Sequence, residues 1–193
     1  MLTRAQPFHL GHLTVLRKIA EENDKVLLLV GSANKEDTRR NPFPIDMRME
    51  QIEDAICYYL PEKYRNKIKV VPLNDWSMED FYSAAEEWGN YLYYTVVYFM
   101  GVKKFRFYYN DDIKIVQNWF NENIAKRVEI RTMNRTNTAA GISSTYLRNL
   151  ILKEDYNTVK SYLLESVTDA QFLAMKRVLK QVERAPKDDF IME

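Results

Sequence analysis

The feature that most constrains the fold is an almost continuous apolar segment, KVLLLVGSA, at residues 25–33. A strand exposed on one face alternates apolar and polar residues, whereas a strand buried on both faces of a parallel sheet is apolar throughout. Three shorter strands are predicted at KIKVVPL, KKFRFYYN and RVEIRTM. The chain therefore predicts a parallel sheet with helices on both faces.

Segments with helical spacing of apolar residues separate these strands. The predicted helices span Leu10 to Glu22, Ile45 to Leu60, Asp80 to Phe99 and Ile113 to Asn123, and another begins in ISSTYLRNLIL. Two more are predicted in the tail, the last with a stripe of Phe172, Met175, Leu179 and Val182. We expect an α/β domain with a doubly wound sheet over residues 1–152, and a helical C-terminal extension packed on it over residues 153–193.

Composition excludes several classes of protein. Lys and Arg number 28 against 27 Asp and Glu, so the net charge of +1 gives no support for a nucleic-acid or membrane-surface partner. The longest apolar run, residues 93–102, is far shorter than the ~20 residues that cross a bilayer. The single cysteine, Cys57, lies in an apolar helical pattern and is predicted to be buried, in a reducing compartment. We expect a soluble cytoplasmic protein.

Both histidines of the chain, His9 and His12, lie in QPFHLGHL, where the first strand would give way to a helix. A helix start offers free backbone N–H groups and the positive end of the helix dipole, which favour an anion. Gly11 lacks the Cβ that would keep a phosphate or an adenine ring from the backbone, and histidine donates hydrogen bonds as a neutral ring or as a cation. The motif predicts a nucleotide site; a helix start without a ligand is the alternative.

A second motif, ISSTYLR, also opens a helix. Its hydroxyl groups belong to Ser143, Ser144 and Thr145, and Arg148 lies one turn further on. Ser and Thr are ordinary helix-capping residues, yet three hydroxyls, free N–H groups and an arginine also suit a polyphosphate. Because both motifs follow a strand and open a helix, the pair indicates a nucleotide site more specifically than either motif alone.

HLGH and ISSTYLR resemble the H-x-G-H and I-S-S-T-x-x-R motifs of the nucleotidyltransferase superfamily. The segments QPFHLGH, GSANKEDTRRNPF, MRMEQIEDAI and PLNDW are similar to nicotinamide-nucleotide adenylyltransferases of the archaeal type. The similarity is greatest to the adenylyltransferase half of bacterial and phage bifunctional proteins that also carry a Nudix hydrolase. It covers about residues 3–150, and because the chain has no Nudix-like pattern, only the transferase half is expected, with a Rossmann-like fold.

The resemblance implies transfer of AMP from ATP to nicotinamide mononucleotide (NMN), giving NAD and pyrophosphate. It implies Mg²⁺ bound mainly through the ATP phosphates, no metal ligands from the protein, and assembly of the chain into a homo-oligomer. Position by position, the implied catalytic residues are His9, His12, Arg48 and Arg148. The implied ATP-binding residues are Arg4, Gln6, Gly11, Ser143, Ser144 and Thr145.

Candidates for binding NMN lie after the first two long strands. Nicotinamide is a flat cationic ring, which suits an aromatic face with a nearby carboxylate. Trp76 and Tyr82 are the candidates for stacking, with Asp75 as a polar partner and Asn41 near the acceptor's phosphate end. For each aromatic residue, a place in the core is the alternative. Asn110 to Asp112, in the YNDD segment, suits either adenine or ribose contacts or a capped turn.

The start of the chain departs from the family's G-R-F-Q-P pattern. Only Met1 and Leu2 precede it, Thr3 stands where glycine is expected, and Ala5 replaces phenylalanine. Three explanations are open: a start that lies upstream, a first strand reduced to Leu2 to Ala5, or a protein that no longer catalyses.

The functional alternatives are a cytidylyltransferase, a phosphopantetheine adenylyltransferase, and a nucleotide-binding subunit that senses NAD or serves assembly without turnover. The NPF and NDW segments argue against the first two of these. The shortened start favours the third, whereas the presence of His9, His12, Arg48 and Arg148 favours a working enzyme.

Overall fold

The computed structural model of the chain describes residues 1–75, 81–109, 116–132 and 142–184. Its strands are all parallel: β1 (Leu2–Thr3), β2 (Val26–Val30), β3 (Ile68–Pro72), β4 (Phe105–Tyr109) and β5 (Val128–Thr132). Hydrogen bonds join β1, β2 and β3 in that order, and β4 pairs separately with β5. In register, Leu28 of β2 faces Val70 of β3, and Phe107 of β4 faces Ile130 of β5.

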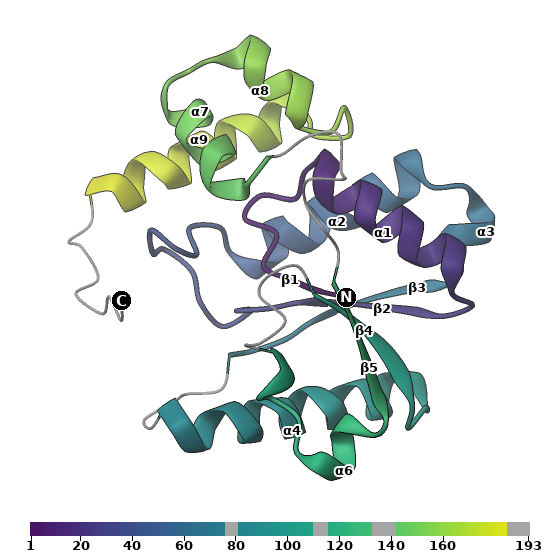
Figure 1. Ribbon diagram of the computed structural model, residues 1–193. Helices are drawn as coiled ribbons and strands as arrows, with labels where there is room; N and C mark the ends of the chain where they lie inside the picture. The colour runs from purple at the N-terminus through teal and green to yellow at the C-terminus, as the bar shows by residue number, and fades with distance from the viewer. Residues whose placement is uncertain (76–80, 110–115, 133–141, 185–193) are drawn as a thin grey trace.

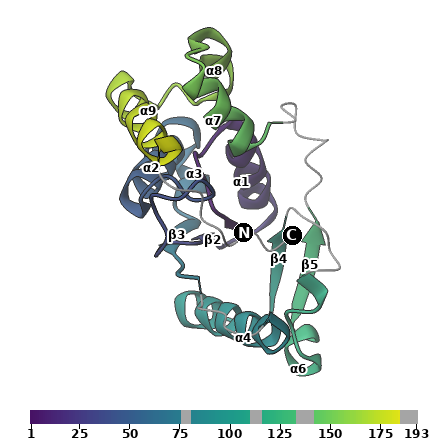
Figure 2. The ribbon, with the colours of Figure 1, turned by 90° about the vertical axis from the view of Figure 1, so that its left-hand side faces the viewer.

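Helices cover both sides of these strands (Figure 1). On one side lie α1 (Leu10–Glu22), α2 (Ile45–Tyr59) and the short α3 (Glu62–Arg65). On the other lie α4 (Phe81–Met100) and α6 (Glu122–Ala125). A separate group, α7 (Ser144–Leu152), α8 (Tyr156–Tyr162) and α9 (Asp169–Arg184), lies far from α4 (Figure 2).

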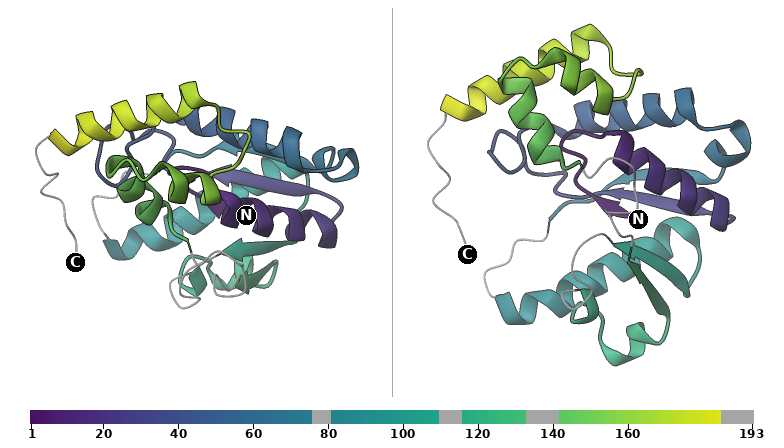
Figure 3. Two further views of the ribbon diagram at one scale, coloured as in Figure 1. Left: turned by 90° about the horizontal axis from the view of Figure 1, so that it is seen from above. Right: turned by 45° about the horizontal axis from the view of Figure 1, so that its top comes forward.

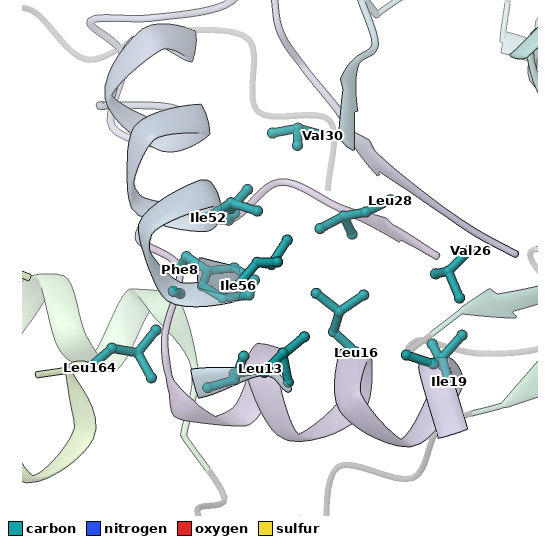
Figure 4. Close-up of a cluster of buried hydrophobic side chains, with 14 of the residues drawn as sticks. Phe8, Leu13, Leu16, Ile19, Val26, Leu28, Val30, Ile52, Ile56 and Leu164 are labelled. Atoms are coloured by element: carbon teal, nitrogen blue, oxygen red, sulfur yellow. The ribbon is translucent and has the colours of Figure 1, made fainter. Parts of the chain in front are cut away.

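Alternating side chains show that the two hydrogen-bonded sheets form one layer. In β2, Leu28 packs in the cluster with α1 and α2, whereas Leu29 packs in the cluster with α4. The neighbouring residues Phe107 and Tyr108 of β4 divide between the same two clusters. Figure 4 shows the first cluster, in which Leu16 of α1 and Ile52 of α2 lie over β2. The predicted doubly wound α/β fold is therefore confirmed.

The hydrogen-bonded layer is interrupted beside β1 because that strand is so short. It pairs with β2 only through Leu2 and Thr3. Ala5 ends any extension, since its φ of 50° lies in the left-handed region, and its N–H donates to the Thr3 hydroxyl at 3.3 Å. A first strand reaching Ala5 is therefore wrong by two residues, and Thr3, where the family pattern has glycine, supports this turn.

The predicted helix over Ile113 to Asn123 is also wrong in its described part, which begins at Val116. Helical structure ends after Gln117, and a new helix, α6, begins after Asn121. The Asn121 side chain accepts a hydrogen bond from the Ile124 N–H at 3.0 Å, as a helix N-cap does. This local capping bond overrides the helical spacing on which the prediction was based.

Cys57 is exposed, so the prediction of a buried thiol is wrong. The buried face of α2 consists of Arg48, Gln51, Ile52, Ala55 and Ile56. Cys57 follows this face by one residue and turns outward, where Arg65 Nη1 lies 3.5 Å from its Sγ. The helical pattern located the helix, but charged and polar residues occupy part of its buried face.

The C-terminal helices share a third hydrophobic cluster with the start of α2. Its buried members are Phe43, Leu147, Leu150, Ile151, Val159, Leu163, Phe172, Met175 and Leu179. The predicted stripe on the last helix is confirmed, because Val182 is buried as well. Figure 3 shows α7, α8 and α9 grouped beside the first turns of α1. Because α7 and α9 share one cluster, the domain boundary after residue 152 stays a prediction.

α4 is the longest described helix, and it packs by one face only. Leu92, Tyr93 and Val96 enter the cluster with β2 and β4, whereas Tyr94 and Tyr98 are exposed.

Across the described residues, no helix has both the length and the apolar character that a bilayer crossing requires.

Gly89→Ala should destabilise the fold strongly, because a Cβ there would lie 1.6 Å from the backbone oxygen of Trp119. Since backbone rather than a side-chain end must move, we expect unfolding free energy to fall by about 3 kcal/mol in urea denaturation. Gly101→Ala is the control: its φ is 66° but nothing lies within 4 Å, so only backbone strain of about 1 kcal/mol is expected. Equal losses in the two variants would contradict this account.

Candidate active site

The first half of the site is the start of α1, which His9 caps. His9 Nδ1 accepts a hydrogen bond from the Gly11 N–H at 3.1 Å, while its carbonyl accepts from the N–H groups of His12 and Leu13. Because Nδ1 is an acceptor, the ring proton lies on Nε2. The cap thus holds a neutral imidazole at the positive end of the helix dipole, with its N–H donor on the far side of the ring.

His12 lies against His9 on the first turn of α1. Their ring centroids are 3.9 Å apart, and Phe8 stacks on His12 at 5.3 Å with its ring nearly parallel. Phe8 is fully buried. The hydrophobic core therefore fixes the His12 ring through Phe8, a contact that the motif alone did not predict, although Phe8 lies within QPFHLGHL.

Gly11 gives His9 its room. A Cβ on Gly11 would lie 3.1 Å from Cε1 of His9 and 3.2 Å from its Nδ1. The predicted reason for this glycine was close approach of a nucleotide to the backbone. The structure adds a different one, because the imidazole itself fills the space that a side chain would need.

The start of α7 lies directly against the turn that precedes α1. Ser144 Oγ donates to the Pro7 carbonyl at 3.2 Å, and Arg148 Nη1 donates to the Gln6 carbonyl at 2.7 Å. Ser143 caps the helix by accepting from the Tyr146 N–H, and Arg148 Nη2 donates to Thr145 Oγ1. The two predicted motifs, which are more than 130 residues apart in the chain, therefore meet.

Two arginines, Arg4 and Arg148, bring positive charge to this meeting point. Burial, followed by the neighbouring positive charge of Arg4, lowers the pKa of Arg148. Two guanidinium groups thus lie close enough to repel one another, next to the N-terminus of α1. Such an arrangement favours an anion that would neutralise both.

Arg48 lies in the floor of the site and is fully buried. Its Nη1 donates to the carbonyls of Arg4 and Gly31 at 3.0 and 2.8 Å, and its Nη2 to that of Ser32 at 3.0 Å. Burial lowers the pKa of Arg48 to about 10, opposed by the negative charges of Asp75 and Glu36. Arg48 thus remains a cation at neutral pH and joins the ends of β1 and β2; its predicted phosphate contact stays a prediction.

The backbone beside these carbonyls is strained. Ala5 has a φ of 50° and Ser32 a φ of 52°, values that residues other than glycine rarely adopt. Ala5 directly follows Arg4, whose carbonyl accepts from Arg48, and the carbonyl of Ser32 itself accepts from Arg48. Strained positions persist only where surrounding contacts fix them, and they gather at functional sites.

Gln6, predicted to bind ATP, uses its side chain within the protein. Its Oε1 accepts from the Phe43 N–H at 2.9 Å, and its Nε2 donates to the Phe43 carbonyl at 3.3 Å. Asn41, a candidate for NMN binding, lies in the same loop and is buried, with its N–H donating to Thr38 Oγ1 at 2.9 Å. Sequence reasoning missed Phe43, whose ring anchors this loop in the cluster with α7 and α9.

Asp75, predicted as a polar partner of nicotinamide, joins the loops after β2 and β3. Its carboxylate accepts from the Ser32 N–H at 3.2 Å and lies 3.2 Å from Lys35 Nζ. The Asn34 carboxamide pairs with both backbone groups of Asp75, at 2.8 and 3.3 Å. Asn34 and Lys35 were missed, although they lie in the GSANKED segment that carries the family resemblance.

Three predicted features cannot be placed in the site. Trp76 and the YNDD segment from Asn110 lie outside the described residues. Tyr82 lies in the first turn of α4, but its side chain is not among those described.

In the described part of the chain, no three His, Cys, Asp or Glu side chains gather as ligands for a metal ion.

Comparison with known proteins identifies the family. Residues 2–150 match the model of the cytidylyltransferase-like family, and the chain belongs to this family. It is 35% identical over 75 residues to a nicotinamide-nucleotide adenylyltransferase of Methanococcus maripaludis, and 35% identical over 80 residues to that of Saccharolobus solfataricus. These matches cover 39% and 42% of this chain. They cover 41% and 45% of the relatives, so the chain aligns with less than half of their length.

Two solved structures share the fold. A bifunctional NMN adenylyltransferase/ADP ribose pyrophosphatase of Francisella tularensis, complexed with AMP and a manganese ion, superposes with a TM-score of 0.68 at 16% identity. The match covers 94% of this chain and 50% of that protein. The nicotinic acid mononucleotide adenylyltransferase of Plasmodium falciparum, complexed with APC, has a TM-score of 0.56 at 17% identity, over 95% and 94% of the two chains. At such identities the similarity establishes the fold alone.

Arg48→Lys should lower the stability of the protein, because one ammonium group cannot reach carbonyls on both strand ends. We expect a loss of about 2–3 kcal/mol in urea denaturation, as buried carbonyls lose their donors. The exposed Arg39, whose Nη2 donates to the Glu183 carbonyl at 3.4 Å, supplies the control. Arg39→Lys should change stability by less than about 0.5 kcal/mol. A similar small change for Arg48→Lys would show that the buried guanidinium does not hold the strand ends.

Proposed function

We propose that the protein is a nicotinamide-nucleotide adenylyltransferase, which transfers AMP from ATP to NMN and releases NAD and pyrophosphate. The observation that carries the proposal is the contact between the two helix starts, through Arg148 and the Gln6 carbonyl at 2.7 Å. This contact gathers imidazole, hydroxyl and guanidinium donors around one anion-binding point. The archaeal relatives named as nicotinamide-nucleotide adenylyltransferases support the choice of reaction.

The triphosphate of ATP would lie at this point. Arg4 and Arg148, which already repel one another, would both gain from a bound polyanion. His9 and His12 would donate from the start of α1, and Thr145 from the start of α7, while Ser144, whose hydroxyl donates to the Pro7 carbonyl, would hold the two helix starts together. In this proposal Gly11 has two roles: it leaves room for the His9 ring that caps α1, and it lets ATP approach the backbone.

Transfer needs no covalent intermediate with the protein. The phosphate of NMN is already a nucleophile, so the site has only to align it with the α-phosphorus of ATP and to stabilise the departing pyrophosphate. Preorganised donors supply that stabilisation as charge moves onto the leaving group. His12, held between His9 and Phe8, is fixed in orientation for such a role.

NMN would lie on the β2 and β3 side of the ATP site. The loop that contains Asn41 follows β2 and meets the turn after β1 through the buried contact between Phe43 and Gln6. The loop that contains Asp75 follows β3 and meets Ser32, directly after β2. Lys35, beside Asp75, provides a cation near the same place. Trp76 and Tyr82 remain the candidates for stacking on nicotinamide, because a flat cationic ring suits an aromatic face.

Mg²⁺ fits the site as part of its complex with ATP. The described residues offer imidazole, hydroxyl and guanidinium groups rather than a cluster of carboxylates, so the oxygen donors that the ion prefers would come from the triphosphate. When bound, the ion would neutralise charge on the phosphates during transfer. The manganese ion in the Francisella structure supports the use of a divalent cation.

A non-catalytic nucleotide-binding subunit is the second candidate, favoured by the interrupted sheet at β1. The strand has only two residues, Leu2 and Thr3, and the left-handed Ala5 follows shortly after it. Arg48 nevertheless holds the ends of β1 and β2 together, which supports a site rigid enough for catalysis.

His12→Ala tests catalysis directly. With ATP, NMN and Mg²⁺, we expect the parent to form NAD and the variant to lose roughly 10²- to 10³-fold in kcat, as when one preorganised donor is removed. Thr14→Ala, an exposed change one half-turn along α1, should leave kcat unchanged. A folded parent that binds ATP yet joins it to no acceptor would leave the non-catalytic candidate.

Removal of the divalent ion should stop turnover without unfolding the protein. In excess chelator we expect NAD formation to fall at least ~10²-fold, because the triphosphate charge is no longer neutralised. Either Mg²⁺ or Mn²⁺ should restore it, while the thermal unfolding midpoint measured without nucleotide stays constant. Unchanged activity in chelator would exclude this role for the ion.

A further inference from the structure

We propose that Gln6 is a positioning residue that sets the distance between the two substrates. Its side chain joins the phosphate turn, residues 4–9, to the acceptor loop, residues 37–43. The inference rests on the adenylyl-transfer function proposed above and deepens it. It gives Gln6 a role different from the direct ATP contact that the family resemblance implies.

The geometry resembles the pairing of two strands. Gln6 Oε1 accepts from the Phe43 N–H at 2.9 Å, and Nε2 donates to the Phe43 carbonyl at 3.3 Å. Only 2% of Gln6 is exposed. Two buried hydrogen bonds, one accepted and one donated by the Gln6 side chain, fix both the position and the orientation of the Phe43 backbone.

Gln6 also meets the third segment of the site. Its own carbonyl accepts from Arg148 Nη1 at 2.7 Å, which links it to α7. The side chain thus faces the acceptor loop while the backbone faces the polyphosphate donors. A change in the side chain would shift the acceptor loop and leave the contact with Arg148 intact.

The acceptor loop also makes an exposed polar contact with α9, in which Arg39 Nη2 donates to the Glu183 carbonyl at 3.4 Å. Its internal bonds join Thr38 and Asn41 to one another, at 2.9 and 3.3 Å, and Phe43 packs its ring against α7 and α9. These contacts shape the loop and bury its end. Gln6 adds the polar connection to the turn where ATP would bind, and in-line transfer is sensitive to shifts of about 1 Å.

The chemistry of the carboxamide provides a reversible test. It carries one donor and one acceptor, and both are used. In Gln6→Glu an ionised carboxylate would face the Phe43 carbonyl with no proton between them, whereas a protonated carboxyl would restore both hydrogen bonds. Burial raises the pKa of such a carboxyl and the nearby cations Arg4 and Arg148 lower it, while the two hydrogen bonds with Phe43 favour the protonated form. We therefore expect the change within the pH range of the assay.

The experiment measures steady-state kinetics with ATP, NMN and Mg²⁺ between about pH 5.5 and 9. For Gln6→Glu we expect the KM for NMN to exceed that of the parent by ~10- to 100-fold at the alkaline end, the effect of one or two lost buried hydrogen bonds. This ratio should shrink towards 1 at the acid end. The KM for ATP should stay within about threefold, because the Arg148 contact uses the backbone.

Gln51→Glu is the matched control. Gln51 is equally buried, at 2% exposure, and its Nε2 contacts the Met175 sulfur between α2 and α9. The same new charge there should lower the stability of the protein. The KM values for ATP and NMN, and their pH dependence, should remain those of the parent. A pH-dependent KM for NMN in both glutamate variants would reduce the role of Gln6 to general stability and overturn the proposal.

Gln6→Met covers the case in which the glutamate variant does not fold. It has similar volume, lacks both hydrogen bonds and carries no charge, so the KM for NMN should rise at every pH without the pH-dependent recovery. If the parent is active and both Gln6→Met and Gln6→Glu show the same kinetics as the parent, the positioning role is overturned, while the proposed enzyme function stands.

An inactive parent would contradict the proposed function. Amide hydrogen exchange would then test separately whether the Gln6 side chain holds the Phe43 backbone. Exchange of the Phe43 N–H should be at least ~10-fold faster in Gln6→Met than in Gln51→Met. Equal exchange in the two variants would overturn the inference independently of turnover.

Discussion

The buried guanidinium of Arg48 is the interaction on which the site depends. It donates to carbonyls at the ends of β1 and β2, two strands joined by only two residue pairs. Because those carbonyls lie next to left-handed Ala5 and Ser32, the backbone needs an internal partner to keep its shape. The shortness of β1 is thus offset by a side chain from α2, and the turn that leads to His9 keeps a defined position.

From this floor the site is built by reciprocal contacts between loops. Gln6 holds Phe43, Asn34 holds Asp75, and Arg148 holds the carbonyl of Gln6. In each case a side chain satisfies backbone groups of another segment, and those of Phe43 are buried, where a missing partner would be costly. These polar residues therefore serve the protein's own backbone, as does Ser144 at the start of α7, which donates to the Pro7 carbonyl.

Sequence reasoning worked where the signal was periodic or local. The buried run of β2 and the start of α1 at Leu10 depend on neighbouring residues and were predicted, and capping by the hydroxyl residues of α7 was one of the two interpretations of that motif. The cap that His9 forms on α1 was not predicted. Sequence reasoning failed at Cys57, because the buried face of α2 includes Arg48 and Gln51, which no hydrophobic pattern would assign to a core. It failed again before α6, where one side-chain cap at Asn121 outweighs helical spacing.

By itself the sequence determined the class of fold, the two motifs and the chemistry they favour. Apolar runs, helix caps and charged groups act over a few residues, so they can be read along the chain. Only the tertiary structure decided which polar residues face inward. Arg48 and Gln6 are assigned to phosphate binding by their positions in motifs, yet each is occupied by carbonyls from distant segments. The partners of a buried polar group are chosen by which backbone ends the fold brings together, and that juxtaposition is not encoded in any one stretch of sequence.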